Sequence, residues 1–367
     1  MIYFDAGATT LQKPLSVPLA TARAIGRCAS PGRGAHAPAL RAADVVYECR
    51  SALAALFAAQ PEQVVFTMNA THALNLAIKT LARSGDEVVV SGFEHNSVRR
   101  PLHALGAHVI VAGRKLFDPE DTLRAFSSAI TARTRLVVCT HVSNVFGYIL
   151  PVEEIAALCR ARGVPFVLDA SQSAGILPVR LRELQADFIA MPGHKGLYGP
   201  QGTGVLLCAR TPEPLLEGGS GSASREAGMP RALPDRAEAG TQNAAGIAGL
   251  LAGVRFVQRR TPQAIFLHEC ALRAAARRAL GALAEVRVFG GPHQAGTLSF
   301  LPRSVPCEQL AARLSEAGIC LRAGLHCAPL AHESAGTLES GTLRLSFSAF
   351  NTHAEVRAFA ARLKKML

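Results

Sequence analysis

Short apolar runs alternate with helix-length segments through the first 210 residues, and this alternation restricts the fold more than any other feature. The runs are rich in Val, Ile and Leu, as in EVVVS at 87–91, and continuous runs of this kind form strands buried on both faces. The pattern predicts an α/β fold with a mostly parallel sheet, in which 204–208 is a hairpin or antiparallel partner. The expected strands are 63–67, 87–91, 108–111, 135–140, 164–169, 187–191 and 204–208, with helices at 70–83, near 98–105 and at 152–162.

The chain changes character after residue 210. Residues 211–241 are rich in Gly, Pro and Ser and are expected to form a long functional loop. The remainder mixes strands and helices in a way that predicts a smaller α+β domain, to which the first residues return. The expected helices are 243–260, 262–280, 307–317 and one from 352, and the expected strands are 286–289, 297–301 and one near 343–347.

The charge of the chain does not indicate a nucleic-acid partner. The 367 residues include 39 Lys and Arg against 27 Asp and Glu, a formal net charge of +12. The basic residues are spread along the whole chain, aromatic residues make up 5%, and Trp is absent. A nucleic-acid site would gather basic residues and offer rings for stacking. We therefore interpret the charge as an aid to solubility and to attracting small anions.

The cysteines and apolar runs bear on the compartment. No apolar stretch approaches the ~18 residues of a membrane-spanning helix, and MIYFDAGATT lacks the features of a signal peptide. The nine cysteines include no CxxC pair, so no metal site is expected. Several stand in apolar runs as small buried hydrophobes. These features predict a cytoplasmic protein in a reducing environment, with no membrane partner.

Polar residues follow the expected strands at the points where the strands end. Ligands bind at the carboxyl ends of strands in a parallel α/β sheet, so these residues should share one edge. Each alone has an ordinary explanation, such as a helix cap for Asp169 or a solvated side chain for Lys195. The residues concerned are Thr71, His95, Asn144, Asp169 and Lys195.

Together these residues have the chemistry that pyridoxal 5'-phosphate (PLP) requires. A lysine in the Gly-rich turn PGHKG can form a Schiff base. A buried Asp169 can keep a pyridinium nitrogen protonated, and a helix that begins at NAT (69–71) can bind phosphate at its N-terminus. Asp169 and Lys195 are 26 residues apart, which allows one strand–helix–strand passage and places them on nearby strand ends.

Sequence motifs along almost the whole chain extend this interpretation. They are YFDAGATT (3–10), PGRGAH (31–36), NATHALNLA (69–77), FEHNSV (93–98), THVSNVFG (140–147), LDASQSAG (168–175), PGHKGLYGPQGTG (192–204), AGTQN (239–243), RAGLHCAPLAH (322–332) and GTLRLSFSAFNTHAEV (341–356). With them the chain resembles the class V aminotransferases of the fold-type I PLP enzymes, and most closely their cysteine desulfurase and selenocysteine lyase branch. The resemblance implies a large domain, 16–260, with a mostly parallel seven-stranded sheet. A smaller C-terminal α+β domain would comprise 1–15 plus 261–367.

The resemblance also implies roles for individual residues. Lys195 would carry the cofactor and move the Cα proton, and His95 would stack on the ring and take part in acid–base steps. Asn144 and Arg344 would bind the substrate carboxylate. The remaining cofactor contacts would come from Ala70, Thr71, Asp169, Gln172, His194 and Thr241, with Thr241 reaching the phosphate of a neighbouring subunit. A homodimer is therefore implied.

The reaction implied is removal of sulfur from L-cysteine, or of selenium from L-selenocysteine, to give L-alanine. Cys327 would be the nucleophile that receives the sulfur as a persulfide, because it stands in a short Gly-containing loop beside His326 and near Arg322. Positive neighbours favour the reactive thiolate. A sulfur-acceptor protein is a possible partner. Three alternatives stay open: a selenocysteine-specific lyase, another class V reaction (transamination, β-elimination or epimerisation), and a binding protein without activity.

Overall fold

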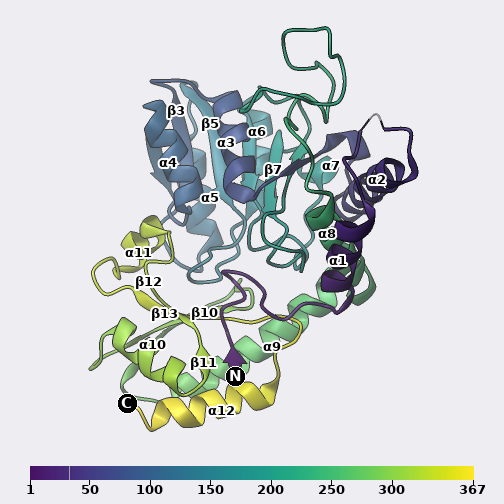
Figure 1. The fold of residues 1–367 in the computed structure, drawn as a ribbon. Coiled ribbons are helices and arrows are strands. Elements are labelled where there is room, and N and C mark those ends of the chain that lie inside the picture. Colours follow the sequence, from purple (N-terminus) through teal and green to yellow (C-terminus); the bar gives the residue numbers. More distant parts are fainter. Residues whose placement is uncertain (33) are drawn as a thin grey trace.

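The structure is a computed structural model that describes residues 1–32 and 34–367. Arg33, within the PGRGAH motif, lies outside the described residues. A seven-stranded sheet with the order β2-β8-β7-β6-β5-β3-β4 organises the larger part of the molecule (Figure 1). Its strands are β2 (Val64–Thr67), β3 (Glu87–Ser91), β4 (His108–Ala112), β5 (Thr134–Thr140), β6 (Phe166–Asp169), β7 (Phe188–Pro192) and β8 (Gly204–Cys208).

Five of these strands run parallel as neighbours, and β8 is antiparallel to both β7 and β2. The predicted mostly parallel sheet and the antiparallel 204–208 strand are thus confirmed. Because β8 is antiparallel to both of its neighbours, β2 points the same way as β7. The carboxyl ends of six strands therefore lie at one edge of the sheet.

Helices cover both faces of this sheet. Along β3, Val88 and Val90 belong to the core beneath one set of helices, whereas Val89 belongs to the core on the other face. This explains why the strand is apolar at every position. One face carries α3 (Ala70–Leu81) and α4 (Asn96–Leu105). The other carries α2 (Ala37–Phe57), α5 (Pro119–Ala129), α6 (Val152–Ala161), α7 (Leu181–Leu184) and α8 (Ala244–Arg260), with α1 (Ser16–Arg27) packed on α8.

A second sheet of four antiparallel strands has the order β12-β13-β10-β9. The N-terminal strand β1 (Ile2–Tyr3) pairs in parallel with β11 (Ile319–Cys320) beside it, so the first residues do return to this part of the molecule (Figure 1). The long helix α9 (Pro262–Gly281) follows α8 and packs on this sheet. The other elements are β9 (Val286–Phe289), β10 (Thr297–Pro302), α10 (Cys307–Glu316), β12 (Arg322–Gly324), α11 (Pro329–Ala335), β13 (Thr342–Ser346) and α12 (His353–Lys364).

Several boundaries differ from the sequence-based expectation for local reasons. The strand expected from 164 begins at Phe166, because Pro165 has no N–H to give to a ladder. The helix expected from 98 begins at Asn96, since the His95 side chain accepts from Ser97 N and caps it. The loop 211–241 contains neither helix nor strand, as expected. The sequence did not predict α1, α2, α5, α7, α11, β1, β11 or β12, nor the short 3₁₀ turn Pro61–Gln63.

Candidate active site

Lys195 lies in the turn between β7 and β8, at the carboxyl edge of the large sheet. The turn is compact: Tyr198 N donates to Lys195 O at 2.9 Å, and Gly199 N donates to Gly193 O at 2.7 Å. A side chain at Gly193 would collide with Thr203, so the turn requires glycine there. Burial lowers the pKa of Lys195 to about 8, while the charge of Asp169 acts in the opposite direction. The amine is thus available as a nucleophile and base near neutral pH.

Asp169 ends β6, one strand away from the lysine turn, and is 3% exposed. Its Oδ1 accepts from Ser171 N at 2.9 Å, and its backbone oxygen accepts from His141 N at 3.0 Å. The charge of this carboxyl acts on the pKa of both Lys195 and His95. A buried acid in this position suits a ring nitrogen that must stay protonated.

His95 follows β3 and is linked by hydrogen bonds to the start of α3. Its Nδ1 lies 2.8 Å from Ser97 Oγ, which in turn lies 2.8 Å from Thr71 Oγ1. Burial lowers the pKa of His95 to about 4. The imidazole is therefore neutral at pH 7, as a ring that stacks on another aromatic system should be. Ser97, which joins two predicted site residues, was not predicted as a site residue, although it stands in the quoted motif FEHNSV.

The N-terminus of α3 has the form of an anion site. Asn69 caps the helix through a bond from His72 N to Oδ1 of 2.9 Å, so Ala70 and Thr71 occupy its first turn. Thr71 is exposed, and free N–H groups at a helix start favour phosphate. His194 lies next to the lysine, and burial lowers its pKa to about 4. Its Nδ1 is buried and has no hydrogen-bond partner within the described chain.

Arg344 on β13 brings the small sheet into the site. The side chain is 2% exposed, and its guanidinium donates to Asp5 Oδ1 at 2.6 Å and to Asn144 O at 3.0 Å. Its Nε is buried without a partner in the part of the chain that is described. Asp5 also receives Arg322 at 3.0 Å. Asp5 was not predicted as a site residue, although its motif YFDAGATT was quoted for the resemblance.

Cys327 lies in the turn between β12 and α11. His326 and Cys327 both have positive φ, 53° and 57°, and Ala328 N donates to Leu325 O at 2.9 Å, which is the geometry of a type I′ turn. Two bonds of 2.8 Å hold this turn against the large sheet: Asn96 N donates to Cys327 O, and Asn144 Nδ2 donates to His326 O. The backbone of Cys327 is thus bound to the residue that follows His95.

Exposure distinguishes Cys327 from the other cysteines. All nine are free and lie in described residues, and Cys327 is exposed while the others are buried or half-buried. Burial raises the pKa of several of these thiols, to about 12 for Cys159 and about 11 for Cys307. A buried thiol of this kind is unreactive. Cys327 therefore has the access that a sulfur-transferring nucleophile needs.

Of the predicted residues, Gln172 lies beside Lys195, whereas Thr241 lies in a separate pocket. Gln172 lines a small cavity together with Lys195, and its Nε2 donates to Gly7 O at 3.0 Å. Thr241 is exposed and lines a separate pocket of 240 Å³ with Met68 and His72. The structure therefore brings ten of the eleven predicted residues to one edge or its border, and leaves Thr241 outside the centre of its own chain.

The residues present fit PLP. The buried acid of Asp169, the amine of Lys195 and the open first turn of α3 are the three groups that the cofactor requires. The unpartnered Nδ1 of His194 supplies a further polar atom beside the lysine. Within the residues described, no cluster of His, Cys, Asp or Glu could hold a metal ion, and no helix is both long and apolar enough to span a membrane.

Several known proteins are similar to this chain in sequence or in fold. A probable cysteine desulfurase of Methanothermobacter thermautotrophicus is 34% identical, over 100% of this chain and 94% of its own. The apo cysteine desulfurase of Thermococcus onnurineus superposes with a TM-score of 0.92 at 33% identity, covering 100% of this chain and 94% of that one. A C-DES mutant with glycine covalently linked to its PLP cofactor gives 0.85 at 25%, covering 98% and 95%. The class-V aminotransferase model matches residues 2–359, and the chain belongs to that family.

Proposed function

We propose that the chain is a PLP-dependent cysteine desulfurase that converts L-cysteine to L-alanine and leaves the sulfur as a persulfide on Cys327. The observation that carries this proposal is the position of Cys327, an exposed thiol whose turn is bonded to Asn96 and Asn144 at the rim of the lysine site. Transamination or β-elimination needs no such thiol. The similarity to proteins described as cysteine desulfurases supports the same reaction.

Residues of this chain would hold the cofactor on three sides. Lys195 would bind it covalently, Asp169 would face the ring nitrogen, and the first turn of α3 would take the phosphate. His95 would lie against the ring and Gln172 would face its phenolic oxygen. The cofactor, when bound, supplies a sink for the electron pair released at Cα.

The other steps belong to side chains. Arg344 would bind the substrate carboxylate through its free Nε edge, with Asn144 beside it, and this fixes the orientation of the Cα–H bond. Lys195, with a pKa of about 8, would take that proton. The Cys327 thiolate would then attack the substrate sulfur. An S–S bond forms, the C–S bond breaks, and a proton returned to the carbon skeleton completes alanine.

Replacing Cys327 by alanine tests this proposal. We expect Cys327→Ala to lose at least ~10²-fold of its alanine and sulfide formation from cysteine, because the carbon-bound sulfur leaves poorly without a thiolate. Selenium leaves more readily, so part of the activity on selenocysteine should remain. Cys320→Ala, at the cysteine nearest to Cys327 in the sequence, is the control. A near wild-type rate on cysteine in Cys327→Ala would exclude the desulfurase and return the assignment to β-elimination or another class V reaction.

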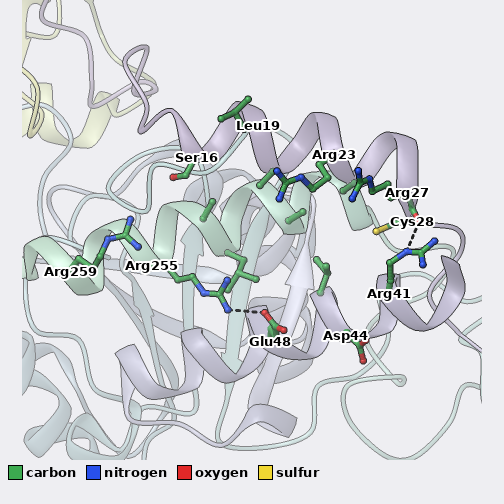
Figure 2. A pocket seen from close by; sticks show the side chains of 16 residues that line it. Ser16, Leu19, Arg23, Arg27, Cys28, Arg41, Asp44, Glu48, Arg255 and Arg259 are labelled. Atoms are coloured by element: carbon green, nitrogen blue, oxygen red, sulfur yellow. Dashed lines mark hydrogen bonds and ion pairs between the residues drawn. The ribbon is translucent and has the colours of Figure 1, made fainter. Parts of the chain in front are cut away.

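We also infer a homodimer, a sulfur-acceptor protein and a cytoplasmic location. Thr241 is exposed two residues before the N-cap of α8, where it could reach a second chain. Large apolar side chains are exposed at the N-cap of α1 (Leu15), on α1 (Leu19) and on α2 (Leu40, Tyr47). A groove of 670 Å³ lies between α1, α2 and α8 (Figure 2). Such exposure is typical of surfaces that another chain covers. Exposed Cys327 could pass its sulfur on, and nine free cysteines suit a reducing compartment.

A further inference from the structure

Glu269 on α9 is a buried carboxyl for which the site described above has no use. The residue is 3% exposed. None of the hydrogen bonds and ion pairs found among the described residues reaches its carboxyl oxygens. Burial raises its pKa well above the usual range. A carboxyl without a protein partner in the interior needs another polar partner, and buried water is the common one.

A cavity with space for water lies against this carboxyl. It offers about 30 Å³, room for roughly two waters. Lys195 and Gln172 line it from segments that follow strands of the large sheet, Glu269 lines it from α9, and Gly296 lines it from just before β10. A Cβ on Gly296 would lie 2.8 Å from Glu269 Oε2. This carboxyl oxygen therefore lies against Gly296, which also lines the cavity. The cavity therefore has a carboxyl at one boundary and the lysine at another.

The other titratable groups near Glu269 are turned to different partners. The hydroxyl of Tyr198, which also lines the cavity, accepts from Ala349 N at 2.8 Å. On α9 itself, three neighbours bond elsewhere: His268 to Asn351 O, Cys270 to Gln294 O, and Arg273 to Gln294 Oε1. Lys195 is thus the cationic side chain that shares the cavity with Glu269.

We propose that Glu269 is a positioning residue for Lys195, and that its carboxyl ends a water-bridged hydrogen-bond chain running through this cavity to Lys195 and Gln172. The inference rests on the proposed role of Lys195 as the cofactor-bearing lysine. The chain of waters solvates the lysine nitrogen from the cavity and limits the cost of its charged form. Because Glu269 belongs to α9 and Lys195 to the large sheet, the chain also joins the two parts of the molecule.

The pH titration of the absorbance band of bound cofactor tests the proposal in the holoenzyme. Glu269→Leu should dry the cavity and move the titration midpoint down by about one pH unit, because desolvation disfavours the protonated nitrogen. Its kcat should fall about tenfold with little change in KM. Glu269→Gln keeps a polar side chain of the same length that can bond water, so its midpoint should stay close to that of the wild type. Cys270→Ala, on the same helix but bonded to Gln294, is the matched control.

An unchanged midpoint in Glu269→Leu, or equal shifts in Glu269→Leu and Glu269→Gln, would overturn the proposal. A crystal structure of the wild-type holoenzyme gives a second measurement that needs no variant: ordered waters must join Glu269 to Lys195, and an empty cavity would also overturn it. Borohydride labelling separates the two hypotheses. Label on the Lys195 peptide in every variant, with no shift of the midpoint, would contradict the role of Glu269 alone. Label on another lysine would contradict the proposed site.

Discussion

Burial, more than neighbouring charge, sets the protonation states of the residues around Lys195. It lowers the pKa of His95, His141 and His194 to about 4 and that of Lys195 to about 8. The site thus contains neutral imidazoles and a lysine that can exchange protons near neutral pH. The same effect acts on Glu94, which is fully buried between the ends of β3 and β5. Its Oε1 accepts from Ser91 Oγ and from Thr140 N at 2.7 Å.

Glu94 should make stability depend on pH. Burial raises its pKa from 4.5 to about 8. Below pH 4.5 the carboxyl is protonated in both the folded and the unfolded chain. Between pH 4.5 and 8 the unfolded chain ionises while the folded chain keeps its proton, so stability falls as pH rises. Glu94→Gln cannot ionise and should gain about 3 kcal/mol relative to wild type between pH 5 and 8, measured by chemical denaturation. If the free energies of unfolding of wild type and Glu94→Gln changed with pH in the same way, this prediction would be wrong. Exposed Glu120→Gln is the control.

Arg344 should be needed for the substrate and not for the cofactor. Lysine cannot reproduce its planar fork, so Arg344→Lys should lower kcat/KM on cysteine by about 10²-fold while the absorbance of bound cofactor stays unchanged. Arg322→Lys, at a side chain that is 48% exposed on the same Asp5, should have a much smaller effect. A kcat/KM equal to that of wild type in Arg344→Lys would remove this residue from the substrate site.

At the scale of elements, the turns carry backbone conformations that side chains disfavour. The cysteine turn has two successive left-handed residues, His326 and Cys327, and neither is glycine. Such residues cost about 1–2 kcal/mol each, and the bonds to Asn96 and Asn144 offset part of this. Ala58, at the C-cap of α2, has φ 50° and lies outside the site.

Ala58→Gly should therefore stabilise the protein by about 1 kcal/mol, because glycine adopts the left-handed conformation without steric cost. The opposite sign is expected three residues earlier. Exposed Ala55 lies inside α2, and Ala55→Gly should destabilise by about 1 kcal/mol. Chemical denaturation measures both variants. A loss of stability in Ala58→Gly similar to that in Ala55→Gly would show that the cap is not strained.

At the scale of the whole molecule, the proposed dimer predicts complementation between two inactive chains. Lys195→Ala lacks the lysine, and Thr241→Val lacks the hydroxyl proposed to complete the neighbour's phosphate site. A mixed dimer contains one intact site, so co-refolding should restore activity in about a quarter of the sites, as random pairing into closed dimers requires. Each variant refolded alone is the control. An active wild-type monomer in sedimentation, or no recovery on mixing, would contradict the shared site.

The amino-acid sequence determined the large sheet and the chemistry at its edge, because both depend on local signals. Continuous apolar runs placed seven strands within a few residues of their observed bounds, and motifs at the strand ends pointed to Lys195, Asp169 and His95. The division at residues 15 and 260 stays a prediction, although β1 pairs with β11. The helices α1 and α2 were not predicted. Of α1 only Val17 and Ala24 are buried, and several of the buried positions of α2 are alanines, so neither sequence shows a clear stripe of large apolar residues.

Only the tertiary structure decided which distant groups meet. Asp5 and Arg344 are 339 residues apart yet form one ion pair. The Cys327 turn is held by the first residue of α4 and by Asn144, which follows β5. No local pattern specifies such contacts, because they depend on how the two sheets pack. The neutral state of Glu94 and the cavity beside Glu269 have the same origin. From the sequence alone a glutamate is expected to be a charged surface residue. Only packing buries its carboxyl and raises its pKa.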